Sequence, residues 1–142
     1  MTASPAPIRV LFLCTHNSAR SQMAEALLRH IGNERFDVQS AGTEVTQVHP
    51  LAVAAMADVS IDISGARSKH LKEFVGDDFD YVITVCDAAN ESCPIFPGDP
   101  QRIHWSFPDP SAVEGSDAQR ARAFAKVRDE VTFRLRTWMQ LF

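Results

Sequence analysis

The sequence has few cysteines, few glycines and no long apolar run, and each shortage excludes a class of protein. Its 142 residues include three cysteines and six glycines. Three thiols are too few for a disulfide-rich secreted scaffold, and no glycine-rich linker or repeat divides the chain. No apolar stretch approaches the roughly 20 residues that cross a bilayer as a helix, and no signal peptide is visible. We therefore expect a cytoplasmic protein that does not bind membranes.

The sequence also lacks an excess of basic residues. Its 14 Lys and Arg residues stand against 18 Asp and Glu residues, for a formal net charge of −4 at pH 7. This balance argues against electrostatic binding to nucleic acid or anionic lipid, so any oxyanion must be held by a local positive site. The length is that of one domain. We predict a flexible tail over residues 1–7 and a single, monomeric domain over residues 8–142.

What the sequence does contain is a cysteine directly after an apolar run. Residues 9–13 predict a strand buried on both faces, and a helical pattern opens at Ser21. Residues 14–20 then form a tight loop between the strand and the helix. The backbone N–H groups of such a loop and the positive end of the next helix make an anion-binding site. Arg20 adds a planar set of donors that suits a tetrahedral oxyanion.

Cys14 is a candidate nucleophile, because this positive environment favours the thiolate. A structural interpretation competes: Cys14 can be a buried thiol at a strand end, and Arg20 a solvated residue in the first turn of the helix. The polar residues between them favour the functional interpretation. The predicted substrate-binding loop comprises Thr15, His16, Asn17, Ser18, Ala19, Arg20 and Ser21.

Strands and helices alternate along the rest of the chain. Further strands are predicted over residues 36–40, 80–85 and 102–106, and helices over residues 21–31, 51–58, 69–74 and 118–138. Residues 87–100 predict a loop. The alternation indicates an α/β fold, with an open, mostly parallel four-stranded sheet and helices on both faces. Ligands bind such sheets beyond the carboxyl ends of the strands, where Cys14, Ser40 and Cys86 are expected.

The stretch Cys14-Thr15-His16-Asn17-Ser18-Ala19-Arg20-Ser21-Gln22-Met23-Ala24-Glu25 resembles the signature of arsenate reductases built on the low-molecular-weight tyrosine phosphatase fold. Shorter segments resemble the same family in the same order: Ser40-Ala41-Gly42, Ile61-Asp62-Ile63-Ser64, Val85-Cys86, Cys93-Pro94, His104-Trp105 and Asp109-Pro110. The resemblance covers nearly the whole chain and implies that fold and that activity.

The resemblance implies that arsenate is reduced to arsenite through a relay of thiols. Cys14 would attack arsenate and form a covalent arsenic–sulfur intermediate, with Asp109 as general acid. Cys86 would then form a disulfide with Cys14, and Cys93 would attack Cys86, leaving an 86–93 disulfide for thioredoxin to reduce. Ser21 would hydrogen-bond Cys14 or cap the next helix. Phosphate and sulfate would bind as analogues of arsenate, and no tightly bound cofactor is implied.

Residue chemistry alone leaves simpler roles open for three of these side chains. Asp109 beside a proline is commonly part of a turn. Cys86 and Cys93 can be unrelated thiols, and seven residues of helix would separate their Cα atoms by about 10.5 Å. A disulfide spans about 7 Å at most. Pairing of these two cysteines would therefore require the segment between them to unwind or bulge.

The resemblance also bears on metal binding. Related reductases often hold a potassium ion with oxygens that this chain also has, at Asn17, Glu25 and Ser40. Their further Thr and Asp ligands are replaced here by Arg67 and Lys69. A cation site beside a lysine is electrostatically unfavourable, so we expect no metal and propose that the Lys69 ammonium replaces potassium. Asn17 is expected to brace the loop.

Two other functions would use part of these features. A phosphotyrosine phosphatase shares Cys14, Arg20 and Asp109 but releases phosphate to water. Such phosphatases commonly carry aromatic residues directly after the Asp-Pro, whereas Ser111 and Ala112 follow here, and a cysteine pair would have no role. A protein that only senses arsenite through its thiols would need no oxyanion-binding loop. A zinc site is not indicated either, because the five histidines have no zinc-type spacing with the cysteines.

Overall fold

The structure is a computed structural model, and it describes residues 6–91 and 93–142. Most of the predicted N-terminal tail, residues 1–5, lies outside the described residues. The elements follow one another as β1 (Ile8–Cys14), α1 (Arg20–Gly32), η1 (Asn33–Arg35), β2 (Phe36–Gly42), α2 (Pro50–Ala57), η2 (Leu71–Glu73), β3 (Tyr81–Thr84), α3 (Asp87–Glu91), β4 (Gln101–His104), η3 (Pro110–Ala112) and α4 (Asp117–Met139).

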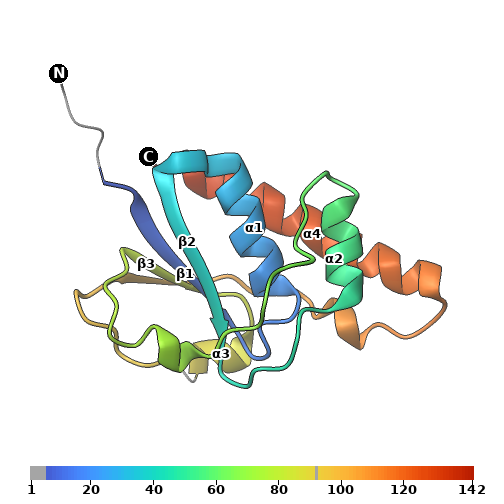
Figure 1. The fold of residues 1–142 in the computed structure, drawn as a ribbon, viewed down its shortest axis with the longest axis horizontal. Coiled ribbons are helices and arrows are strands. Elements are labelled where there is room, and N and C mark those ends of the chain that lie inside the picture. Colours follow the sequence, from blue (N-terminus) through green and yellow to red (C-terminus); the bar gives the residue numbers. More distant parts are fainter. Residues whose placement is uncertain (1–5, 92) are drawn as a thin grey trace.

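The four strands form one parallel sheet in the order β2-β1-β3-β4, which confirms the predicted open α/β architecture (Figure 1). After β1 the chain crosses to β2 on one side, and it later returns to β3 on the other side. The strand order therefore reverses between β1 and β3, and ligand crevices form at the carboxyl ends of strands beside such a reversal. Cys14 ends β1 and Cys86 follows β3, so both flank this point.

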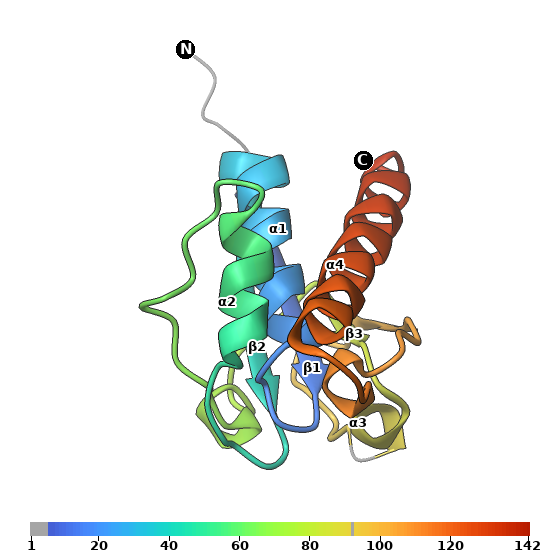
Figure 2. The same cartoon turned by 90° about the vertical axis from the view of Figure 1, so that its right-hand side faces the viewer.

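The long helices α1 and α4 cover one face of the sheet, and α2 packs outside them (Figure 2). Four consecutive β1 residues, 10–13, are fully buried, as expected for a central strand. The apolar stripe predicted for the last helix is buried at Phe124, Val127, Val131, Leu135 and Trp138. Its last member, Trp138, contacts the ring of Phe36 on β2 with centroids 5.6 Å apart.

Shorter segments cover the opposite face of the sheet. The Arg9 guanidinium on β1 lies 4.9 Å above the ring of Phe79. That ring also contacts Phe74, directly after η2, and Phe96 in the segment before β4. Within residues 6–91 and 93–142, no helix has the length and apolar character needed to cross a membrane.

Three predictions of local structure were wrong. The stretch predicted as a loop over residues 87–100 begins with helix α3, which Ala88 and Ala89 favour and in which Ala89 is fully buried. The helix predicted over residues 69–74 is only the short 3₁₀ turn η2. His70 caps this turn, so the turn begins at Leu71 and not at residue 69. Helix α1 begins at Arg20, so Ser21 lies inside the helix and does not cap it.

Candidate active site

The Cys14 loop (residues 14–20) joins the central strand to the long helix α1. Cys14 is buried, and its Sγ accepts a hydrogen bond from the Asn17 backbone N–H at 3.2 Å and lies 2.8 Å from Ser21 Oγ. The N-cap residue of α1 is Ala19, whose side chain cannot cap the helix, and its first turn carries Arg20 but no acidic residue. The positive end of α1 therefore points into the loop, and no carboxylate in its first turn neutralises it. This arrangement suits the loop to binding an anion.

Asn17 holds the loop in shape from its centre. It is fully buried and adopts a left-handed backbone conformation with φ of 53°, which asparagine tolerates better than most residues. Its Nδ2 donates to Ser21 Oγ at 2.7 Å and to Ser40 Oγ at 3.0 Å. Its Oδ1 accepts from Gln22 Nε2 at 2.8 Å and from the Lys69 N–H at 2.9 Å. The side-chain amide thus uses both donors and both acceptor positions.

The segment after β2 supports the loop through its backbone. Glu44 N–H donates to the Thr15 carbonyl at 2.8 Å, and His49 N–H donates to the Ser18 carbonyl at 2.9 Å. His16 is exposed at the outer side of the loop, with its Nε2 3.6 Å from a carboxylate oxygen of Glu44. The backbone of the loop is therefore fixed before any ligand binds.

Gly42 permits the close approach of β2 to this loop. A Cβ atom at this position would lie 2.6 Å from the Thr15 carbonyl oxygen and 2.9 Å from the Asn17 nitrogen, both backbone atoms that cannot move aside easily. We expect Gly42→Ala to lower the free energy of unfolding by about 1–3 kcal/mol and to weaken binding of inorganic phosphate. Chemical denaturation and calorimetric titration measure the two effects. Gly65→Ala is the matched control, because a Cβ there meets nothing within 4 Å; equal behaviour of the two variants would contradict the prediction.

Arg20 connects the Cys14 loop to the segment that carries Asp109. Its Nη1 donates to the Phe107 carbonyl at 3.1 Å, and its Nη2 lies 3.9 Å from Asp109 Oδ2. Burial of the Asp109 carboxyl opposes its ionisation, but hydrogen bonds from Ser111 and the nearby charges of Arg20 and His16 outweigh that effect, so the pKa of Asp109 lies below its ordinary value. Asp109 is therefore a carboxylate at neutral pH.

The three cysteines are free thiols, and the structure places two of them at the loop. Cys86 is buried, and its Sγ lies 3.3 Å from Oγ1 of Thr15, the residue that follows Cys14. Cys93 lies beyond α3, half-buried, with its Sγ 3.6 Å from the Pro94 carbonyl oxygen. Burial raises the pKa of the Cys93 thiol, although the nearby Arg102 opposes this effect.

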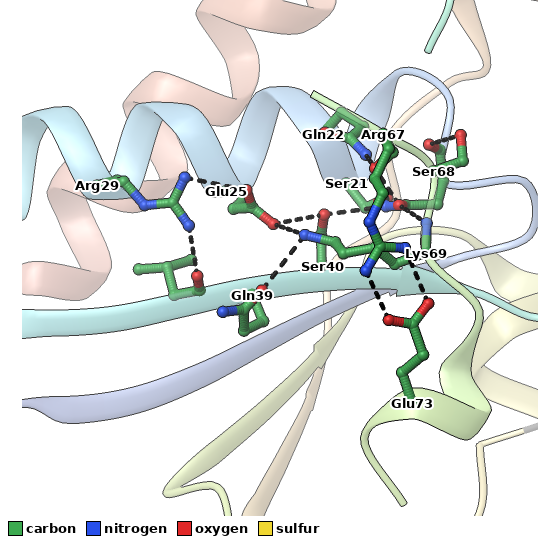
Figure 3. A network of polar contacts seen from close by, with 12 residues as sticks. Ser21, Gln22, Glu25, Arg29, Gln39, Ser40, Arg67, Ser68, Lys69 and Glu73 are labelled. Carbon is green, nitrogen blue, oxygen red and sulfur yellow. Dashed lines mark hydrogen bonds and ion pairs between the residues drawn. The ribbon is translucent and has the colours of Figure 1, made fainter. Parts of the chain in front are cut away.

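A buried ion pair lies beside the loop, between α1 and β2 (Figure 3). Lys69 Nζ donates to Glu25 Oε1 at 2.7 Å and to Gln39 Oε1 at 3.3 Å, and the side chains of this Lys–Glu pair are 13% and 8% exposed. Ser40 Oγ donates to the same carboxylate oxygen at 2.8 Å, and Arg29 Nη1 donates to the other at 3.0 Å. The ammonium thus interacts with oxygens from α1 and β2, as a bound cation would.

Gln22 and Ser68 complete this network, and no sequence pattern predicted a role for either of them. Gln22 Nε2 also donates to the Arg67 carbonyl at 2.8 Å, and Ser68 Oγ donates to the Asn17 carbonyl at 2.9 Å. The Arg67 side chain points elsewhere and pairs with Glu73 at 2.7 Å. Gln22 is 2% exposed in the middle of a buried helix face, and a polar residue at such a position is the one signal that could have revealed the network.

The described part of the chain contains no cluster of three or more His, Cys, Asp or Glu side chains arranged to hold a metal ion. A parallel sheet of this order with a Cys-x5-Arg loop after its first strand defines a phosphatase-like α/β protein. The family model described as low molecular weight phosphotyrosine protein phosphatase matches residues 9–142, and the chain belongs to this family.

Similar proteins within this family are named arsenate reductases. The chain is 40% identical over 131 residues to an arsenate reductase of Halalkalibacterium halodurans, covering 92% of this chain and 94% of the relative. A solved structure described as an arsenate reductase in the phosphate binding state is 34% identical, with a TM-score of 0.70 and coverage of 94% and 97%. A thioredoxin-dependent arsenate reductase of Corynebacterium glutamicum is 31% identical, with a TM-score of 0.71; the match covers 98% of this chain and 63% of that one.

Proposed function

We propose that this protein reduces arsenate to arsenite with Cys14, Cys86 and Cys93, and that thioredoxin regenerates it. The observation that carries the proposal is the placement of the Cys86 sulfur 3.3 Å from the Thr15 hydroxyl. A second thiol directly beside the residue after Cys14 is what a disulfide relay requires and what a phosphatase does not need. The names of the similar arsenate reductases support the same assignment.

Arsenate would bind in the Cys14 loop as a tetrahedral oxyanion. The loop N–H groups, the uncapped positive end of α1 and the Arg20 guanidinium would hold its oxygens. The similar structure described as an arsenate reductase in the phosphate binding state supports oxyanion binding by such a fold. Phosphate and sulfate would compete for the same loop.

The first chemical step would be attack of the Cys14 thiolate on arsenic. A sulfur–arsenic bond forms, an arsenic–oxygen bond breaks, and the departing hydroxyl takes a proton from Asp109. Asp109 has a lowered pKa in the free protein, so it must first gain that proton. Bound arsenate would favour protonation of Asp109 in two ways. Its negative charge lies near the carboxylate, and it pairs with Arg20, which otherwise stabilises the ionised carboxyl.

The second step would transfer two electrons to arsenic. Cys86 loses its proton and attacks the Cys14 sulfur, so a 14–86 disulfide forms while the sulfur–arsenic bond breaks and leaves its electron pair on arsenic. Arsenic passes from the +5 to the +3 state and leaves as arsenite. Cys93 then attacks Cys86, which forms the 86–93 disulfide and releases Cys14 as a thiolate.

The last exchange requires α3 to come apart, because this helix separates Cys86 from Cys93. The raised pKa of the Cys93 thiol keeps that residue unreactive until it leaves its half-buried position. Thioredoxin would reduce the resulting disulfide from outside. The proposal assigns the protein to the cytoplasm, where thiols are kept reduced, and to a monomeric state with no nucleic acid or membrane partner.

The Lys69 ammonium would take the place of a potassium ion. Loss of this ammonium should therefore lower the free energy of unfolding. Lys69→Met is expected to lower the free energy of unfolding by about 2 kcal/mol, since Glu25 would keep only Arg29 and Ser40 as partners. Denaturation in potassium, sodium and choline chloride measures the effect: the wild type should show no potassium-specific stabilisation. Lys72→Met, at an exposed position, is the control. A strong and specific effect of potassium on the wild type would contradict the replacement.

The test of the proposed function is arsenate-dependent consumption of NADPH in the presence of thioredoxin and its reductase. We expect NADPH oxidation that needs all components and yields arsenite in equal amount. Hydrolysis of p-nitrophenyl phosphate without arsenate-dependent NADPH oxidation would instead indicate a phosphatase. Stoichiometric binding of arsenite without turnover would indicate a sensor.

A further inference from the structure

His104 connects the two chain segments that flank Cys86. Its Nδ1 lies 2.7 Å from Oγ1 of Thr84, the last residue of β3, and its Nε2 lies 2.8 Å from Oδ1 of Asp87, the first residue of α3. These two partners stand two residues before and one residue after Cys86. One imidazole on β4 therefore holds the chain on both sides of the second thiol.

The two partners occupy both nitrogens of the imidazole ring. A carboxylate accepts hydrogen bonds, so Nε2 is the ring nitrogen that suits Asp87 as a donor. The other nitrogen, Nδ1, is left to pair with the Thr84 hydroxyl, which can donate or accept. Both ring nitrogens are used, and Thr84 is also fixed by its backbone, because its carbonyl accepts from the Trp105 N–H at 2.8 Å. The contact with Asp87 is thus the movable end of the arrangement.

Besides its packing against β1 and β3, few contacts of the described residues hold helix α3. It is five residues long, too short to be stable by itself, and Ala89 is its only fully buried residue among those whose side chains are described. Beyond it, the Cys93 carbonyl accepts from Arg102 Nη2 at 3.4 Å. Arg102 and His104 are two residues apart on β4, so they lie on the same face of that strand. Both ends of the α3 segment are therefore attached to β4.

We propose that His104 is a positioning residue for Cys86: by joining Thr84 to Asp87 it holds the Cys86 sulfur against Thr15, where it can reach Cys14. This inference rests on the proposed relay. It assigns His104 to the step in which the 14–86 disulfide forms, and it gives no contact between His104 and any reacting atom. When α3 comes apart for the exchange with Cys93, the Asp87 contact is the one that opens.

The test uses the full-length Cys93→Ser protein, in which the relay stops at the 14–86 disulfide. Trypsin separates residues 10–20, which contain Cys14, from residues 73–102, which contain Cys86, so the linked peptides identify this disulfide by mass. Its rate of formation is followed after adding arsenate and, separately, diamide. Diamide oxidises neighbouring thiols without arsenate, so it reports on the position of Cys86 even if the protein does not reduce arsenate.

We expect His104→Ala to slow formation of the 14–86 disulfide roughly 10-fold or more with either reagent, because two hydrogen bonds that fix Cys86 are lost. His104→Gln should restore most of the rate, since its side-chain amide can accept from Thr84 and donate to Asp87. His30→Ala, an exposed histidine on α1, is the control and should have no effect.

Three results would overturn the positioning role: an unchanged rate in His104→Ala, an equal loss in His104→Gln, or a parallel loss of affinity for inorganic phosphate, which would show that the whole fold is disturbed. If diamide shows the His104 effect while arsenate yields no disulfide in any variant, the proposed reductase function fails and the positioning role stands.

Discussion

Replacing any one of the three cysteines with serine is expected to abolish arsenate turnover supported by thioredoxin, with a loss of at least about 1,000-fold. The reason in the proposed relay differs from one position to the next. Without Cys14 no sulfur–arsenic bond would form. Without Cys86 the arsenic adduct on Cys14 would have no attacking thiol beside it, and without Cys93 the protein would stop after one turnover as the 14–86 disulfide.

The disulfide that accumulates in each variant distinguishes the three roles better than the loss of turnover does. After one addition of arsenate and alkylation of free thiols, Cys93→Ser should yield linked tryptic peptides 10–20 and 73–102, whereas the wild type should yield a disulfide within peptide 73–102. Cys14→Ser should yield neither. Wild-type protein without arsenate is the control. Full turnover in Cys86→Ser or Cys93→Ser would mean that an external thiol attacks the adduct directly, and the relay would be wrong.

Replacing Arg20 with lysine is expected to lower kcat/KM for arsenate by about 100- to 1,000-fold, although the charge is kept. The guanidinium is planar and contacts the Phe107 carbonyl at 3.1 Å while facing Asp109 at 3.9 Å. A lysine ammonium is a point charge without this fork, so it cannot bind two arsenate oxygens side by side and remain attached to the Asp109 segment.

Steady-state kinetics with varied arsenate measures this effect, and the initial rate of Cys14 alkylation with and without phosphate shows whether anion binding itself is weakened. Arg136→Lys, at an exposed position in the last turn of α4, is the matched control and should behave as the wild type. If Arg20→Lys retains its activity, a positive charge alone is sufficient and the planar shape of the guanidinium is not required.

The sequence made the fold predictable where local chemistry and burial agree. Residues 10–13 are apolar on both faces and form the central strand, and the loop after Cys14 lies where the change from apolar to polar residues predicts it. Helix α3 was not predictable, because five residues are too few for the helix propensity of Ala88 and Ala89 to decide, and the burial of Ala89 and the His104–Asp87 contact come from the tertiary structure. Local propensity carries neither piece of information.

The sequence predicted which residue types make up the candidate site, but it predicted less well which of these residues contact one another. The polar contact of Thr15 with Cys86 joins residues 71 positions apart, and no local pattern encodes such a distance. The sequence suggested a lysine beside Glu25, but the geometry with Ser40 and Gln39 depends on how β2 packs against α1. The contacts of His104 were not predictable, since its two partners come from different elements.

The uncapped start of α1 has a consequence for how this protein should be handled and compared. The first turn of α1 carries Arg20 and no acidic residue of its own, so the folded state should be more stable when a tetrahedral anion is bound there. Melting temperatures in phosphate buffer would then exceed those in amine buffers at equal ionic strength. Inside a cell that is rich in phosphate, the rate of detoxification would follow the ratio of arsenate to phosphate and not the arsenate concentration alone.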